Sequence, residues 1–97
     1  MKQEDLTSTQ KLINSECMQV ADLLIKKNKA YGNSALEPLR IFSKADAEEG
    51  MNVRIDDKLS RIARGVDTGN VPEETELDLI GYLILKRVLK AAKEVQP

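Results

Sequence analysis

The sequence predicts an all-α fold, a compact four-helix domain that spans residues 1–97. Two helix-capping signals precede apolar residues at helical spacing, and two more apolar stretches with that spacing follow. No alternating apolar and polar run, and no Asn-Gly turn between apolar runs, indicates a pair of strands. The length is typical of one domain, and no repeat, linker or low-complexity tract divides the chain.

The first helix is expected to begin after Thr7, which can form a capping box with Gln10. The helix should run for about 20 residues because its apolar stripe continues that far. Gly32 is a suitable left-handed stop. The stripe consists of Ile13, Cys17, Val20 and Leu24, widened by Leu23. As the only cysteine, Cys17 is expected to be a small apolar filler in a reducing compartment.

A second, shorter helix is predicted after Ser34, which has Glu37 three residues later as in a capping box. Pro38 would then lie in the first turn, where a missing N–H matters little. The helix is expected to continue through Leu39 and Phe42 and to end in the polar stretch SKADAEEG.

The third helix is predicted to start near Met51 and to bury one apolar face. That face consists of Met51, Ile55, Leu59 and Ile62. The stretch RGVDTGNVP should end the helix with its two glycines.

The last helix is predicted to open at Pro72 and to carry acids in its first turn, as the helix dipole favours. From Leu77 onward its sequence predicts burial almost all round. The apolar residues are Leu77, Leu79, Ile80, Leu83, Ile84, Leu85, Val88 and Leu89. Asp78 lies among them, and a buried carboxylate needs a cation, a metal or a ligand as its partner.

One side of the third helix carries charged residues that border its apolar face: Arg54, Asp57, Lys58 and Arg61. The short connection to the last helix predicts an antiparallel hairpin. Folding the chain about residues 68–69 places Asp78 level with Leu59, between Lys58 and Arg61. Glu74 and Tyr82 share an edge of the last helix with Asp78.

These charges allow two interpretations. A half-buried ion-pair network that locks the two helices would show the same spacing. Alternatively, the residues line a site for an anionic ligand, in which arginine and lysine bind phosphates and the carboxylates hold Mg²⁺. The phosphate ligands would be Arg54, Lys58 and Arg61, and the metal ligands Asp57, Glu74 and Asp78. Tyr31 is open to a packing role or to stacking on a base, and Ser34 and Tyr82 are further candidates to bind the ligand.

Composition excludes several classes of function. The chain has no histidine, which removes histidine-based metal sites and Ser-His or Cys-His nucleophiles. A net charge of −1 argues against nucleic-acid binding driven by bulk positive charge. No signal peptide and no apolar segment of membrane-spanning length is present, so a cytosolic protein is expected, without membrane partners.

The order KNKAYGNS, RIDDKLSRI and EETELDLIGYLIL resembles the nucleotide-modification-associated domain family of small phage and prophage proteins. That family is related in pattern to the MazG-like all-α nucleoside triphosphate pyrophosphohydrolases. The resemblance runs from about Lys27 to Leu85. It implies a helical bundle that oligomerises and binds nucleotides between helices. Its most specific pieces contain Tyr31, Gly32 and Ser34, then Arg54, Asp57, Lys58 and Arg61, then Glu74, Asp78 and Tyr82.

The chain departs from the acidic pattern of the MazG-like enzymes. The resemblance implies Mg²⁺ binding by an E-x-x-E pair on one helix and an E-x-x-D pair on the next. The third helix offers Asp56 and Asp57 without an E-x-x-E, and the last helix has Glu74 four residues before Asp78. Nucleotide binding depends less than hydrolysis on the missing pair.

Three functions follow as hypotheses. The first is non-catalytic binding of a nucleotide or nucleotide-derived signal, which in a phage setting would sequester a signal of host defence or assist nucleotide modification. The second is an Mg²⁺-dependent nucleoside triphosphate pyrophosphohydrolase. The third is a helical interaction protein without a small ligand. In each case the apolar last helix predicts a homo-oligomer, because four helices cannot cover all its faces.

Overall fold

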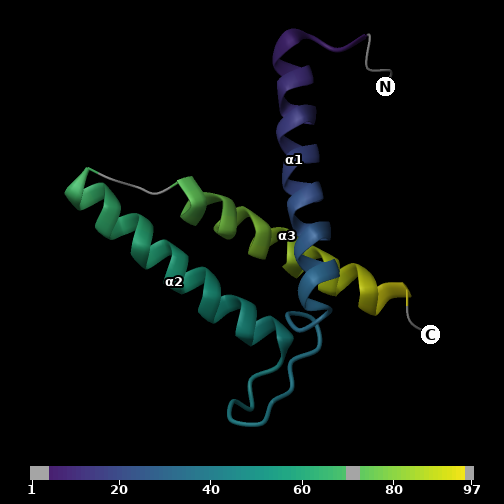
Figure 1. Cartoon of the computed structure of the whole chain (residues 1–97), viewed down its shortest axis with the longest axis vertical. Coiled ribbons are helices and arrows are strands. Elements are labelled where there is room, and N and C mark those ends of the chain that lie inside the picture. The colour runs from purple at the N-terminus through teal and green to yellow at the C-terminus, as the bar shows by residue number, and fades with distance from the viewer. Residues whose placement is uncertain (1–4, 70–72, 96–97) are drawn as a thin grey trace. The chain divides into compact units, whose positions relative to one another are not determined.

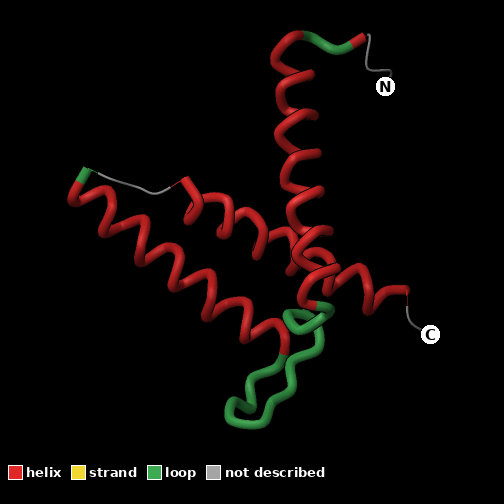
Figure 2. Tube along the Cα trace, viewed as in Figure 1, coloured by secondary structure: helices red, strands yellow, loops and turns green. Residues whose placement is uncertain are grey.

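The computed structural model describes residues 5–69 and 73–95, and within them the chain forms three α-helices and no strand (Figures 1 and 2). The all-α prediction is therefore confirmed for the described residues. The chain divides into two compact units, Met1–Gly32 and Asn33–Pro97. Each unit is described by itself, and the expectation of a single domain stays a prediction.

The first unit contains α1 (Ser8–Tyr31), whose two predicted ends are confirmed. The Thr7 hydroxyl accepts a hydrogen bond from the Gln10 backbone N–H at 3.2 Å, and the Gln10 side chain accepts one from the Thr7 N–H at 3.0 Å. Gly32 ends the helix with a φ of 68°. The expectation that Cys17 is buried is wrong: its side chain is exposed. Within residues 5–32, the described part of this unit, no second helix covers the apolar stripe of α1.

The predicted short second helix is wrong, because residues 33–46 form turns and loop (Figure 2). Only one turn closes, in which the Asn33 carbonyl accepts hydrogen bonds from the N–H groups of Leu36 and Glu37 at 2.9 and 2.8 Å. Arg40 then adopts a positive φ of 61°, which no right-handed helix accommodates. The segment predicted as helix, residues 34–42, is also too short to form a stable helix without a packed apolar face.

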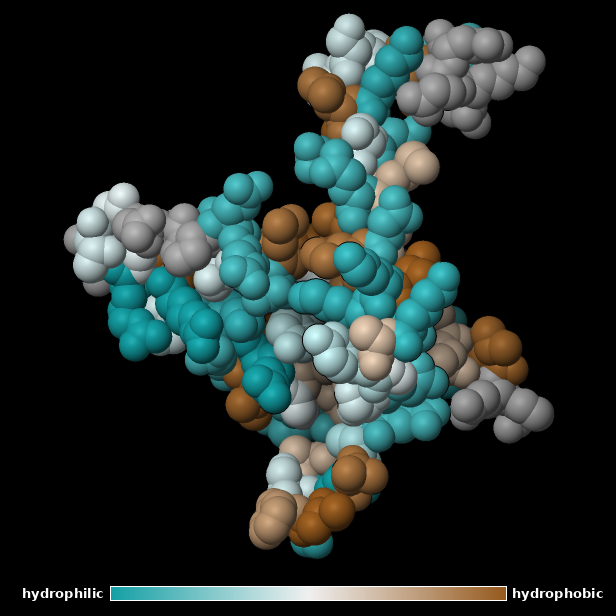
Figure 3. Space-filling view, in the orientation of Figure 1, coloured by the Kyte–Doolittle hydropathy of each residue, from teal (hydrophilic) through white to brown (hydrophobic). Residues whose placement is uncertain are grey.

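Three large apolar side chains of this loop, Leu39, Ile41 and Phe42, are exposed, and the space-filling view shows apolar surface on the loop (Figure 3). Phe42 is fully exposed and Leu39 is 86% exposed, so burial does not favour a helix here. Two reciprocal contacts hold the loop instead. The Arg40 guanidinium donates to the Lys44 carbonyl from Nη2 at 2.8 Å and from Nε at 3.1 Å, and Lys44 Nζ donates to the Arg40 carbonyl at 3.4 Å.

The second unit contains α2 (Ala47–Thr68), which begins about one turn before the predicted start. Asp46 is the N-cap, and its Oδ1 accepts a hydrogen bond from the Glu49 N–H at 2.9 Å. Of the two glycines predicted to end the helix, Gly65 remains inside it. Gly69 ends the helix in the left-handed conformation, with a φ of 76°.

The last helix, α3 (Glu73–Val95), runs antiparallel to α2 and packs along it, as predicted (Figure 1). Three acids occupy its first turn, also as predicted, whereas Pro72 lies outside the described residues. On α2, Met51 is only 2% exposed and Ile55 and Ile62 are half-buried. Leu59 departs from the predicted buried face, because 48% of it is exposed.

Burial of α3 almost all round is not observed. Ile80, Leu83 and Val88 are 44, 48 and 40% exposed, whereas Thr75 and Gly81 are buried. Within the second unit α2 is the one described helix that packs against α3, and one helix covers only one side of another. Among the described residues, no helix combines the length and the apolar character needed to span a membrane.

Candidate functional site

Four charged side chains meet where α2 packs against α3: Asp57, Lys58 and Arg61 of α2, and Asp78 of α3. We call them the polar seam. Lys58 Nζ lies 3.4 Å from Asp78 Oδ2 and 3.9 Å from Asp57 Oδ2. The side chain of Lys58 is 12% exposed and that of Asp78 is 23% exposed. The predicted pairing of Asp78 with the charged side of α2 is therefore confirmed, and Lys58 supplies the cation.

The outer part of the seam is open to solvent. Arg61 Nε lies 3.4 Å from Asp57 Oδ2, one helical turn away, and these side chains are 53 and 45% exposed. The contact uses Nε and leaves the two Nη groups of the guanidinium, which are donors suited to phosphate oxygens. In the part of the chain that the structure describes, no hydrogen bond or ion pair engages those Nη groups.

Arg54 lies on α2 one turn before Asp57 and Lys58, and it is exposed. It forms no ion pair with any described carboxylate. The helical repeat places Arg54 and Arg61, seven residues apart, on the same side of α2. Two arginines thus border a pair of carboxylates that are joined through Lys58.

Two of the three carboxylates proposed as Mg²⁺ ligands contact a lysine. The Lys58 ammonium lies within 4 Å of the carboxylates of both Asp57 and Asp78. Its positive charge therefore compensates carboxylate charge that a metal ion would otherwise compensate. Among the residues that the structure describes, no three acidic or other ligating side chains gather into a group that could hold a metal ion. Binding of Mg²⁺ by Asp57, Glu74 and Asp78 stays a prediction.

The remaining predicted site residues are not joined to the polar seam by any contact described here. Glu74 is exposed in the first turn of α3, and Tyr82 is half-buried one turn after Asp78. Tyr31, 77% exposed, ends α1 in the first unit, and Ser34 is exposed in the loop of the second. Ligand binding by these four residues stays a prediction.

A second polar contact between α2 and α3 was not predicted. Lys86 Nζ donates a hydrogen bond to Asn52 Oδ1 at 2.7 Å, and the pair is partly buried. The antiparallel register indicates this contact, because folding about residues 68–69 brings position 52 level with position 86, as it brings Lys58 close to Asp78. The charge pattern did not predict this contact, because Asn52 is uncharged and is not one of the charged residues Arg54, Asp57, Lys58 and Arg61 of α2.

In comparisons with known proteins, no protein family, no curated protein and no solved structure matches the chain.

Proposed function

We propose that this protein binds a nucleotide or a nucleotide-derived signal without turning it over. The observation that carries the proposal is the polar seam, in which Lys58 joins two carboxylates and the half-exposed Arg61 contacts Asp57 through Nε. The seam fixes the side chains in place, so a ligand meets cations that are already ordered. The resemblance in sequence supports a nucleotide as the anion, and the phage setting with a host-defence signal rests on that resemblance alone.

In the proposed complex the arginines bind phosphate oxygens. Arg61 does so through Nη, with Asp57 holding the guanidinium from Nε. Arg54 supplies a second guanidinium on the same side of α2. Asp78 acts indirectly, because its contact with Lys58 orients the ammonium.

Binding without turnover is favoured over pyrophosphate hydrolysis by one observation. Lys58 lies between the carboxylates that would have to share a metal ion, and hydrolysis of this class requires the metal to activate water. The contact also supports an interpretation as a helix lock. The experiment must therefore separate all three functions.

Purified protein is incubated with linear, deoxy, modified and cyclic nucleotides, with and without Mg²⁺. Mass spectrometry then follows the free and the protein-retained fractions. We expect one nucleotide class to be retained unchanged in both conditions. Conversion to a monophosphate and pyrophosphate only with Mg²⁺ would instead establish the hydrolase. Retention of no nucleotide would leave the seam as a helix lock.

Two variants, each of which replaces one cationic side chain by alanine, then test the site with the retained nucleotide. Arg61→Ala is expected to weaken retention roughly tenfold, because it removes charge-assisted hydrogen bonds to phosphate. Lys11→Ala removes an exposed cation of α1 that lies outside the seam, and it should leave retention unchanged. An equal loss in both variants would show general electrostatic attraction and would contradict a site at the seam.

We also propose that the chain forms a homo-oligomer. The exposed apolar residues Ile80, Leu83 and Val88 of α3 support this assembly. Leu83→Glu places a charge on that surface and should lower the mass measured by light scattering at a given protein concentration. The exposed Lys90→Glu, also on α3, is the control and should leave the mass unchanged. A monomeric mass for the unmodified protein would refute the proposal.

A further inference from the structure

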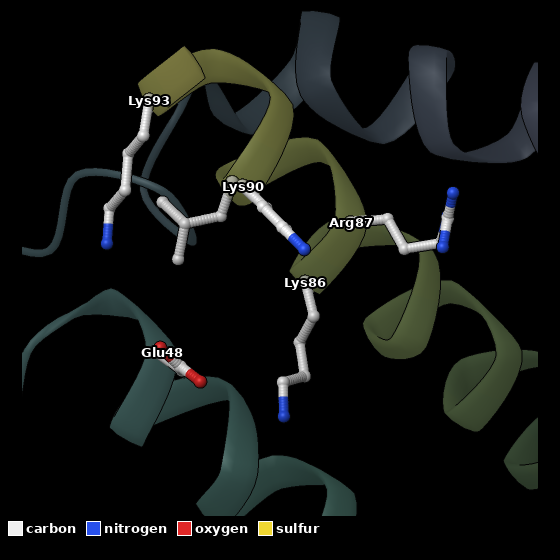
Figure 4. Close-up of a pocket in the computed structure, with 6 residues that line it drawn as sticks. Glu48, Lys86, Arg87, Lys90 and Lys93 are labelled. Carbon is white, nitrogen blue, oxygen red and sulfur yellow. The ribbon is translucent and has the colours of Figure 1, made fainter.

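A basic hollow lies between the first turns of α2 and the C-terminal half of α3, away from the polar seam in sequence (Figure 4). Its volume is about 320 Å³, at the lower end of the range of about 300–1,000 Å³ for small-ligand pockets. It is lined by four cationic side chains, one carboxylate and one leucine: Lys86, Arg87, Lys90, Lys93, Glu48 and Leu89.

Three of the cations share one side of α3. Lys86, Lys90 and Lys93 are spaced by four and three residues, which places them on one helical face. Figure 4 shows Lys86 and Lys93 extending on the side of α3 that faces Glu48, whereas Arg87 points away from Glu48. We therefore assign the hollow to the three lysines.

The three lysines are not neutralised by the rest of the described chain. Lys86 Nζ is held by the amide oxygen of Asn52 at 2.7 Å, a neutral partner that fixes its position and keeps its charge. Lys90 and Lys93 are exposed, and within residues 5–69 and 73–95 no carboxylate forms an ion pair with either. Glu48 lines the hollow but likewise has no ion pair among the described residues.

The helix dipole explains only part of this cluster. Lys93 lies in the last turn of α3, where a cation complements the partial negative charge of the helix end. Lys86 lies about two turns earlier, beyond the reach of that effect. A cluster that continues so far along one face, around a hollow, indicates a negatively charged ligand with more than one charge.

We propose that the basic hollow is a second anion site, distinct from the polar seam, that binds a chain of two or three linked phosphates. Lysine ammonium groups bind phosphate as compact point charges on flexible stems. Side chains at positions i, i+4 and i+7 reach successive phosphates of one compact chain. Leu89 forms an apolar part of the lining. Free polyphosphate and the phosphate chain of a nucleotide share this chemistry.

Calorimetric titration of the full chain with inorganic tripolyphosphate tests the site. The test variant is Lys90→Gln combined with Lys93→Gln. The matched control is Lys11→Gln combined with Lys26→Gln, two exposed lysines of α1. We expect saturable binding by the unmodified protein and a loss of roughly tenfold or more in the test pair, because two contacts between charged groups are removed. The control pair should bind as the unmodified protein does.

Far-UV circular dichroism establishes that the test pair is folded. If it is not, Lys93→Gln alone replaces it and should still weaken binding measurably. Absence of saturable binding, or an equal loss in the control pair, would overturn the proposal. Weakening by Arg61→Ala without weakening by the test pair would assign the phosphate chain to the polar seam, and would also overturn it.

A second arm distinguishes the sources of the ligand. If adenosine triphosphate binds and the test pair weakens its binding as well, the site takes the phosphate chain of a nucleotide. If only tripolyphosphate binds there, the site takes free polyphosphate. A single-stranded oligonucleotide that binds more tightly than either, with the same dependence on Lys90 and Lys93, would refute the assignment to a compact phosphate chain.

Discussion

Replacement of Lys58 by methionine tests whether the inner half of the polar seam holds α2 and α3 together. The substitution keeps the length of the side chain and removes an ammonium 3.4 Å from the Asp78 carboxylate. Because these side chains are only 12 and 23% exposed, water replaces the lost partner poorly. Breaking a fully buried pair costs about 3–5 kcal/mol, and an exposed pair is worth about 0–1 kcal/mol.

The partly buried Lys58 pair lies between these limits, so Lys58→Met should lower the free energy of unfolding by about 1–2 kcal/mol. For a domain of this length that corresponds to a fall in melting temperature of roughly 4–8 °C for each kcal/mol. Arg61→Gln removes a pair whose side chains are 53 and 45% exposed. Screening by solvent reduces its expected cost to below about 0.5 kcal/mol.

The assay is urea unfolding followed by circular dichroism, at one protein concentration for all variants. Asp78→Asn and the double variant with Lys58→Met complete a mutant cycle, and their coupling energy should be about 1 kcal/mol. Two results would refute the reasoning. One is a cost for Lys58→Met no greater than that for Arg61→Gln, and the other is additive effects of the Lys58 and Asp78 substitutions.

Three further predictions concern a helix cap, two glycines and the contact between Asn52 and Lys86. Thr7→Ala removes the capping hydroxyl of α1 and should lower the free energy of unfolding by about 1 kcal/mol, together with the helical ellipticity. An unchanged free energy of unfolding would contradict the observed cap. Gly69→Ala should lower the free energy of unfolding by about 1 kcal/mol, because Gly69 has a φ of 76°. Gly50→Ala, inside α2, should leave that free energy unchanged or raise it, because an added Cβ meets no atom within 4 Å. Destabilisation by both substitutions would be inconsistent with these backbone conformations. Asn52→Ala removes the oxygen that accepts a hydrogen bond from Lys86, and it should lower the free energy of unfolding in urea by about 1 kcal/mol. Asn52→Asp keeps an acceptor oxygen and should cause a smaller loss.

Local signals in the sequence were sufficient to predict both ends of α1. The capping box at Thr7 and the stop at Gly32 depend on residues within one turn, and both are present. The short helix after Ser34 had the same kind of signal, yet it does not form. A cap stabilises a helix that packing already favours, and Phe42 in this segment is fully exposed. The cap was therefore insufficient without an apolar partner.

The candidate site was predictable where it follows from the register of one hairpin. An antiparallel fold-back fixes which positions are level, so the contact between Lys58 and Asp78 followed from spacing and loop length. The choice of Lys58 as the partner did not follow, because that register placed Asp78 between Lys58 and Arg61. The exposure of Ile80 and Leu83 could not be derived either, since it depends on how many helices cover α3.

The loop of residues 33–46 precedes both helices of the second unit, and this order in the chain has a consequence for sequence change. Both partners of the contact between Lys58 and Asp78 lie on the C-terminal side of that loop, as do Asn52 and Lys86. Insertions or deletions in the loop can therefore alter its length without changing the register between α2 and α3. The length of the loop can vary while α2 and α3 keep the contacts between Lys58 and Asp78 and between Asn52 and Lys86.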